Sequence, residues 1–126
     1  MSMRRLIEAA EGKNMENALG RRGSDLQGAN FSDANLKGAD FVDAYLGGAQ
    51  MMFANFTTAK LNHANLSDAD LSEANLSGAY FTSANFKNAD FQNADFKNAD
   101  FRNADFSNAK YLDRAKWPKG YRLVKE

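Results

Sequence analysis

The sequence predicts an all-β solenoid, because a five-residue unit recurs without insertion over most of the chain. Eighteen units follow one another from residue 24 to residue 113 of the 126 residues. The first position of the unit is alanine in 17 units, and the third position always holds a large, mostly apolar side chain. The second position is Asn or Asp in 13 units, and small or polar residues dominate the fourth and fifth positions.

A period of five fits neither an α-helix nor a straight strand. Five residues of an α-helix turn by about 500°, so successive large side chains would scatter around its axis. In a straight strand an odd period would place them on alternate faces. The first and third positions share one interior only if the chain turns at the fourth and fifth positions, where residues such as Gly28 and Gly38 tolerate turns. The spacing therefore predicts a coil that turns every five residues, and it leaves the number of sides open.

Three of the units resemble the A(D/N)LXX repeat of the pentapeptide-repeat family: ANFSD (29–33), ANLKG (34–38) and ANLSG (74–78). The resemblance implies a right-handed quadrilateral β-helix with four units per coil, and thus about 4.5 coils over the repeats. Each residue would then lie above the residue 20 positions earlier. All third-position side chains, including Tyr111 in the last unit, are expected to face the interior.

The segments on either side of the solenoid at 24–113 are expected to cap it, since a solenoid leaves strand edges open at both ends. Residues 1–23 are expected to form an amphipathic helix over the first coil, and a membrane-surface or partner-docking helix is the alternative. The apolar residues with helical spacing there are Met3, Leu6, Ile7 and Ala10. In the tail at 114–126, the residues expected to fold over the last coil are Trp117, Tyr121 and Leu123.

No residue pattern indicates an active site, a cofactor or a metal centre, and we expect a protein that is not an enzyme. The chain has no cysteine, and its one histidine, His63, falls at a fifth position that we expect to be exposed. A run of second-position carboxylates faces different sides of the coil, so we expect solvated side chains: Asp90, Asp95, Asp100 and Asp105. The stacked pair Asp70 and Asp90 could share a cation, which is the alternative.

Apolar side chains at outward positions give one candidate interaction patch. Met52 and Phe53 occupy fourth and fifth positions that are polar in the coils above and below. Tyr45 replaces the usual Asn or Asp, and Val42 lies in the adjacent unit. Exposed apolar residues indicate either a contact patch or variation without function.

The function that these observations favour is a structural scaffold or protein–protein interaction module with an unidentified protein partner. Residues 24–113 carry 12 acidic and 6 basic side chains, which disfavours direct nucleic-acid binding. The resemblance offers an alternative, since some members of the family mimic DNA and bind DNA gyrase. Ice binding is a poorer alternative, because the coils contain only three threonines: Thr57, Thr58 and Thr82.

No apolar run approaches the length of a membrane span, and the N-terminus lacks the apolar core of a secretory signal. We therefore expect a cytoplasmic protein. The resemblance to the pentapeptide-repeat family implies the alternative, a processed form in the chloroplast or thylakoid lumen. The expected caps favour a monomer, and the resemblance to the family implies an end-to-end dimer as the alternative.

Overall fold

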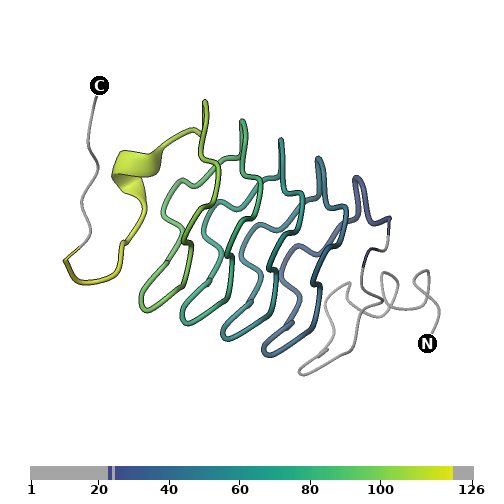
Figure 1. The fold of residues 1–126 in the computed structure, drawn as a ribbon, viewed down its shortest axis with the longest axis horizontal. Helices are drawn as coiled ribbons and strands as arrows, with labels where there is room; N and C mark the ends of the chain where they lie inside the picture. The colour runs from purple at the N-terminus through teal and green to yellow at the C-terminus, as the bar shows by residue number, and fades with distance from the viewer. Residues whose placement is uncertain (1–22, 24, 121–126) are drawn as a thin grey trace.

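The chain winds into stacked four-sided coils that advance along the long axis of the molecule (Figure 1). The computed structural model describes residue 23 and residues 25–120. Parallel bridges run from Asp25↔Tyr45 to Asp90↔Lys110, and each joins residues 20 apart. One coil therefore contains four units, and the predicted stacking of each residue on the one 20 positions earlier is confirmed. The helix expected over residues 1–23 lies outside the described residues, apart from Gly23 at its end.

Backbone hydrogen bonds account for four of the five N–H groups in each unit between residues 49 and 93. In a representative unit, Asn65 donates to a first-position carbonyl of the preceding coil at 2.9 Å, and Leu66 donates to a second-position carbonyl of the next coil at 2.7 Å. Asp68 donates to a fourth-position carbonyl of the next coil at 2.8 Å, and Ala64 closes the turn before it at 3.1 Å. Each side of an inner coil is thus hydrogen-bonded to both neighbouring coils. Because every unit also turns, the pairing takes the form of short bridges and not of long strands.

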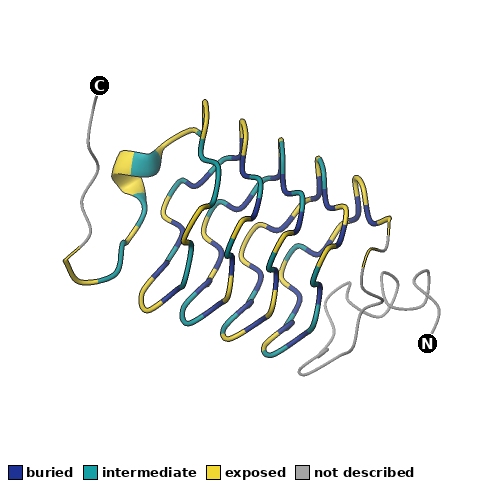
Figure 2. Cartoon of the chain, viewed as in Figure 1, coloured by how far each residue is buried: buried dark blue, intermediate teal, exposed yellow. Residues whose placement is uncertain are grey.

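The interior consists of the first and third positions, as predicted. Every alanine from Ala29 to Ala99 and every third-position side chain from Leu26 to Phe96 is buried, and no polar side chain in the described part of the chain joins them. Around each coil, short buried segments alternate with exposed and half-buried ones (Figure 2). Burial of a large apolar side chain contributes about 1.5–3 kcal/mol, so stability accumulates coil by coil.

The regular coil ends at Tyr111, and the prediction that this side chain faces the interior is wrong. Tyr111 has a left-handed backbone (φ 61°) and is 44% exposed. The 3₁₀-helix η1, Leu112–Arg114, follows it at once, and the bridge Asp95↔Lys116 then spans 21 residues. The early turn places one extra residue in this coil, and Tyr111 is carried to the surface.

Trp117 takes the next inward place and packs over the last coil, as predicted. Its ring stacks on Phe96 with 4.9 Å between ring centroids, and it meets Phe101 edge-on at 5.4 Å. The indole Nε1 donates a hydrogen bond to the carbonyl of Leu112 at 3.0 Å. The tail residues Tyr121 and Leu123 lie outside the described part of the chain.

Candidate interaction surface

The outward side chains sit on a backbone with a fixed left-handed turn at each corner. All 17 fifth-position residues from Gly28 to Asn108 have a positive φ. Glycine adopts this conformation without strain, and Asn and Asp adopt it more readily than other residues. Phe53 and Thr58 adopt it with φ 59° in both cases, although bulky and β-branched side chains disfavour it. The corners therefore restrict which residues can appear on the surface.

The second-position Asn and Asp residues stabilise the corners, a role that the sequence reasoning missed. All 13 of these side chains accept a hydrogen bond through Oδ1 from the N–H two residues later, as Asn75 does from Ser77 at 3.0 Å. This is the Asx turn. It satisfies the fourth-position N–H, which makes no backbone hydrogen bond. The signal was the Asn or Asp preference two residues before each expected turn.

Met52 and Phe53 form an exposed apolar corner, which we call the apolar corner below. Phe53 is 58% exposed and Met52 is 37% exposed. Gln50 holds the second position of this unit, so the corner is built without an Asx turn. The apolar corner thus combines a bulky residue in a left-handed conformation with the absence of the usual side-chain support.

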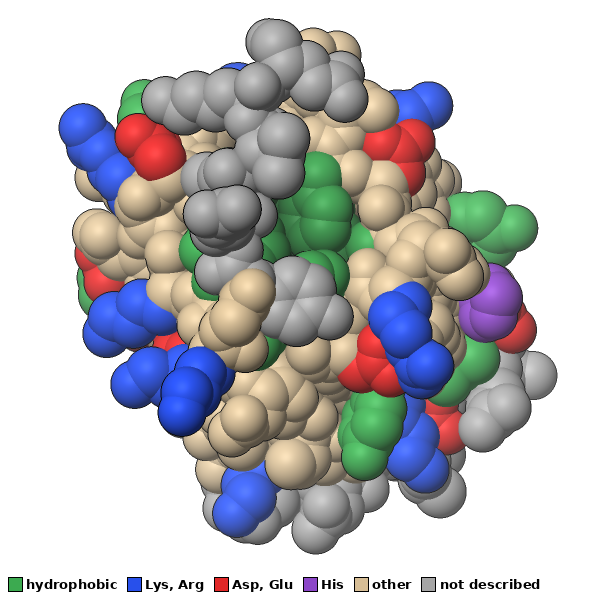
Figure 3. All heavy atoms as spheres, turned by 60° about the vertical axis from the view of Figure 1, so that its left-hand side comes forward, with side chains coloured by type: hydrophobic (Ala, Val, Ile, Leu, Met, Phe, Trp, Pro, Cys, Tyr) green, Lys and Arg blue, Asp and Glu red, His purple; other side chains and the backbone are tan. Residues whose placement is uncertain are grey.

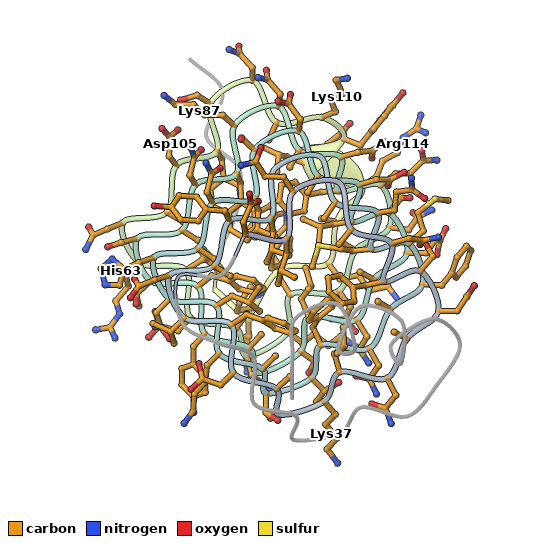
Figure 4. The ribbon with its side chains drawn as sticks, turned by 90° about the vertical axis from the view of Figure 1, so that its right-hand side faces the viewer. Lys37, His63, Lys87, Asp105, Lys110 and Arg114 are labelled. Carbon is orange, nitrogen blue, oxygen red and sulfur yellow. The ribbon has the colours of Figure 1, made fainter. Side chains whose placement is uncertain are left out.

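The structure separates Val42 from the apolar corner. Val42 lies ten residues before Met52, which is half of a 20-residue coil and therefore the diagonally opposite corner. Figure 4 looks along the solenoid, and it shows His63, from the corner row of Val42, and Arg114, from the side of the apolar corner, on opposite sides. Tyr45, 51% exposed, lies on the side between Val42 and the next corner. The four candidate residues therefore do not make one surface.

Carboxylates lie one coil below and one coil above Phe53. Asp33 donates its N–H to the carbonyl of Met52 at 2.9 Å, and Phe53 donates to the carbonyl of Ser72 at 3.2 Å. These bonds place Asp33 and Glu73 directly on either side of Phe53 in the same corner row. Both residues are exposed, and Glu73 accepts a hydrogen bond through Oε1 from Asn93 at 2.8 Å.

The side that carries the apolar corner is acidic, whereas the opposite side is not. We call the side formed by residues 27–33, 47–53, 67–73 and 87–93 the acidic side. In these four segments the one basic residue is Lys87, and the acidic residues are Asp33, Asp68, Asp70, Glu73 and Asp90. The last coil adds Lys110 and Asp113 to the same side. The opposite side, formed by residues 37–43, 57–63, 77–83 and 97–103, has three acidic residues and four basic ones: Asp40, Asp43, Asp100, Lys37, Lys60, Lys97 and Arg102. At the C-terminal end, basic side chains are spread around the rim (Figure 3).

Two carboxyl groups on the other sides have lowered pKa values. Hydrogen bonds from Arg102 hold the pKa of Asp100 below its ordinary value, with Nε to Oδ1 at 2.9 Å and Nη2 to Oδ2 at 2.7 Å. A hydrogen bond from the Ser107 hydroxyl lowers the pKa of Asp105, and Lys87, 3.8 Å from its Oδ2, adds to the effect. Both carboxyl groups are thus engaged with neighbours on the surface.

The described residues offer no group of three or more potential metal ligands. The stacked residues Asp70 and Asp90 each use Oδ1 in their own Asx turn, at 3.0 Å in both cases. His63 is exposed, as expected from its fifth position. None of the helical structure in the described ranges has the length and apolar character needed to cross a membrane.

Comparison with known proteins identifies the repeat. The family model described as pentapeptide repeats matches residues 22–51, 49–88 and 79–110, which together span more than half of the chain. No curated protein sequence matches the chain.

Solved structures share the fold. A pentapeptide repeat protein from the thylakoid lumen of Arabidopsis thaliana is 28% identical, with a TM-score of 0.70 over 85% of this chain and 70% of that one. Rfr23, from the cyanobacterium Cyanothece 51142, is 18% identical, with a TM-score of 0.68 over 92% of this chain and 99% of that one. QnrB1, a plasmid-mediated fluoroquinolone resistance protein, is 19% identical over 84% of this chain and 70% of that one, but its TM-score of 0.39 is too low to support an argument about function. The fold is the right-handed quadrilateral β-helix of these proteins.

Proposed function

Since the chain belongs to the pentapeptide repeat family, we propose that it is a non-enzymatic module for protein–protein interaction and that the apolar corner contacts its partner. The exposure of Phe53 carries this proposal. A bulky apolar side chain at a left-handed corner is unfavourable both for the backbone and for contact with water. Asn or Gly would suit the same position better, as they do at most other corners. A contact that buries Phe53 would compensate for both costs.

The rest of the surface supports an interaction role over chemistry. Interaction energy tends to concentrate in a few aromatic or arginine side chains that polar residues surround. Phe53 and Met52 fit this pattern, because polar and charged side chains lie in the coils above and below them. The hydrogen bonds between coils hold the backbone of the corner in place before a partner binds. Binding would therefore not have to order a loop, which would lower its entropy cost. The DNA-mimic alternative and the compartment of the protein both stay predictions.

The proposal is tested by partner capture from the native host with a corner variant. We expect Met52→Ser with Phe53→Asn to reduce capture of a saturable partner by at least tenfold, roughly the effect of losing one interface hot spot. Quantitative mass spectrometry of the captured proteins measures the ratio, and sedimentation measures self-association in parallel.

The matched control is Tyr80→Ser, which removes an exposed aromatic side chain from the opposite side of the solenoid. Tyr80 is 47% exposed, close to the exposure of Phe53. The control should retain capture and sedimentation behaviour. Unchanged capture and unchanged self-association in the corner variant would exclude the apolar corner as the contact surface.

A further inference from the structure

We infer that the apolar corner binds an arginine side chain of the partner protein, with the guanidinium group on the ring of Phe53 and between the carboxylates of Asp33 and Glu73. This inference rests on the proposed function and specifies the chemistry of the partner. It follows from three features: the exposed ring, the two flanking carboxylates and the negative charge of the surrounding side.

Phe53 differs from the other exposed aromatic residues of the regular coils in what lies one coil away. Its two neighbours in the corner row are both carboxylates, Asp33 and Glu73. Each of the others has at most one carboxylate in these places: Tyr45 lies between Asp25 and Asn65, and Tyr80 lies between Lys60 and Asp100. The carboxylate of Asp100 is already paired with Arg102 at 2.7 Å. The combination of an exposed ring with two acidic neighbours therefore occurs at Phe53.

The spacing suits a planar cation. Adjacent coils lie about 4.8 Å apart, so Asp33 and Glu73 are separated by about 10 Å with the ring of Phe53 between them. A cation over the ring is attracted to the negative face of the π-system, and a guanidinium group can donate hydrogen bonds at its edges at the same time. Arginine is favoured over lysine, because its guanidinium group is planar, more weakly hydrated and able to stack on an aromatic face.

The molecule already contains both halves of this arrangement. At the C-terminal end of the solenoid, the guanidinium carbon of Arg114 lies 5.4 Å from the ring centroid of Tyr111. Arg102 donates two hydrogen bonds to the carboxylate of Asp100 on the opposite side. At the apolar corner the ring and the carboxylates are present together, and between residues 27 and 93 the acidic side has one basic residue, Lys87. The charge of this side favours a basic partner and disfavours phosphate-bearing partners.

The test is a titration of the ¹⁵N-labelled full chain with three acetylated pentapeptides, Gly-Ser-X-Ser-Gly, in which X is arginine, lysine or citrulline. Citrulline keeps the shape of arginine and lacks the charge. We expect amide shifts centred on Asp33, Phe53 and Glu73, with the arginine peptide binding at least about fivefold more tightly than the citrulline peptide. Phe53→Asn should remove the preference, and Asp33→Asn with Glu73→Gln should weaken arginine binding and its dependence on salt.

Phe53→Asn introduces a residue suited to the left-handed corner, so the variant should fold, and its amide spectrum away from the corner checks this. Tyr80→Asn is the control and should leave arginine binding unchanged. Equal binding of the arginine and citrulline peptides, or arginine-induced shifts that persist in Phe53→Asn, would overturn the inference. If the inference is overturned but the Met52→Ser, Phe53→Asn variant still loses partner capture, the proposed function stands. The partner would then contact the corner through a group other than arginine. Arginine binding at Phe53 with unchanged capture would instead contradict the proposed function alone.

Discussion

Nine of the ten phenylalanines occupy third positions, and Phe53 occupies a corner. The seven in the coils up to Phe96 are buried, and their rings meet edge-on or tilted at 5.1–6.5 Å. In the last coil Phe101 and Phe106 are half-buried. Phe53, in contrast, is 58% exposed. The same residue type thus supplies folding energy inside the coil, and at the corner it opposes the local backbone preference. Interior and corner are therefore under different physical constraints.

The largest effect should come from emptying the interior. Phe86 is fully buried, with rings at 5.1 Å on either side and Phe106 stacked on it at 5.0 Å. We expect Phe86→Ala to lower the free energy of unfolding by about 3–5 kcal/mol. The substitution leaves a cavity, and the backbone hydrogen bonds between coils keep the surrounding coils from closing it. Phe106→Ala, in the half-buried last coil, should cost clearly less. Denaturant unfolding compares the two, and equal losses would contradict the graded interior.

Overfilling the interior should have the next largest effect. Ala74 is 1% exposed, whereas Ser77, at the corner of the same unit, is half-exposed. Ala74→Leu forces three further carbon atoms into a close-packed interior, and we expect a loss of about 1–3 kcal/mol. Ser77→Leu should change stability by less than about 0.5 kcal/mol. Melting temperatures of the two variants measure the contrast. Similar values would contradict the assignment of interior and corner.

Loss of an Asx turn should be smaller. The Oδ1 atom of Asn75 accepts the N–H of Ser77 at 3.0 Å, and the other N–H groups of the unit are bonded through the backbone. Asn75→Ala leaves that N–H to water and should cost about 1 kcal/mol. Asn75→Asp keeps the acceptor and is the matched control. Chemical denaturation of both variants distinguishes a role in the turn from a general intolerance of change.

Relieving the strained corner should stabilise the protein. Asn tolerates the left-handed conformation that Phe53 adopts at φ 59°. We expect Phe53→Asn to raise the free energy of unfolding by about 0.5–1 kcal/mol, while partner capture falls. Phe53→Gly should also relieve the strain, with a smaller gain because glycine is more flexible in the unfolded chain. A destabilised Phe53→Asn variant would indicate that the ring packs on the coil and is not held there for a partner.

The smallest effect concerns protonation of Asp100. Arg102 lowers the pKa of this carboxyl group, so its stabilising contact is fully present above the unfolded pKa of about 3.9 and is lost as the pH falls through the lower folded value. Arg102→Gln should therefore raise the pKa of Asp100 towards its ordinary value. A carbon-13 NMR titration of the Asp100 carboxyl group measures the change. Because the pair is exposed, global stability near neutral pH should hardly change.

The interior of the fold was predictable from the sequence, whereas the surface was only partly so. Alanine and a large residue two apart, repeated every five residues, predict the inward rows from residue 26 to residue 99, and burial confirms them. The early turn at Tyr111 was not predictable, because its unit still begins with alanine and keeps an aromatic third residue. That turn depends on η1 and on the place that Trp117 takes over Phe96.

The candidate site was predicted residue by residue but not as a surface. Met52 and Phe53 stood out because both coil neighbours are polar at these positions. Grouping them with Val42 relied on closeness in the sequence, and a four-sided coil turns residues ten apart to opposite corners. The acidic side emerges only when residues 20 apart are placed side by side. The Asx turns depend on bonds between a side chain and the backbone that composition alone does not reveal.

The 20-residue repeat of the bridges makes angular position around the axis a function of residue number. Deleting one five-residue unit between Phe53 and Glu73 would rotate every later residue by a quarter turn relative to Phe53. Glu73 would then leave the row of Phe53, even though its own unit is unchanged. Deleting 20 residues would shorten the rod and keep all rows in phase. A surface that several coils share is therefore preserved only when the length of the solenoid changes by whole coils.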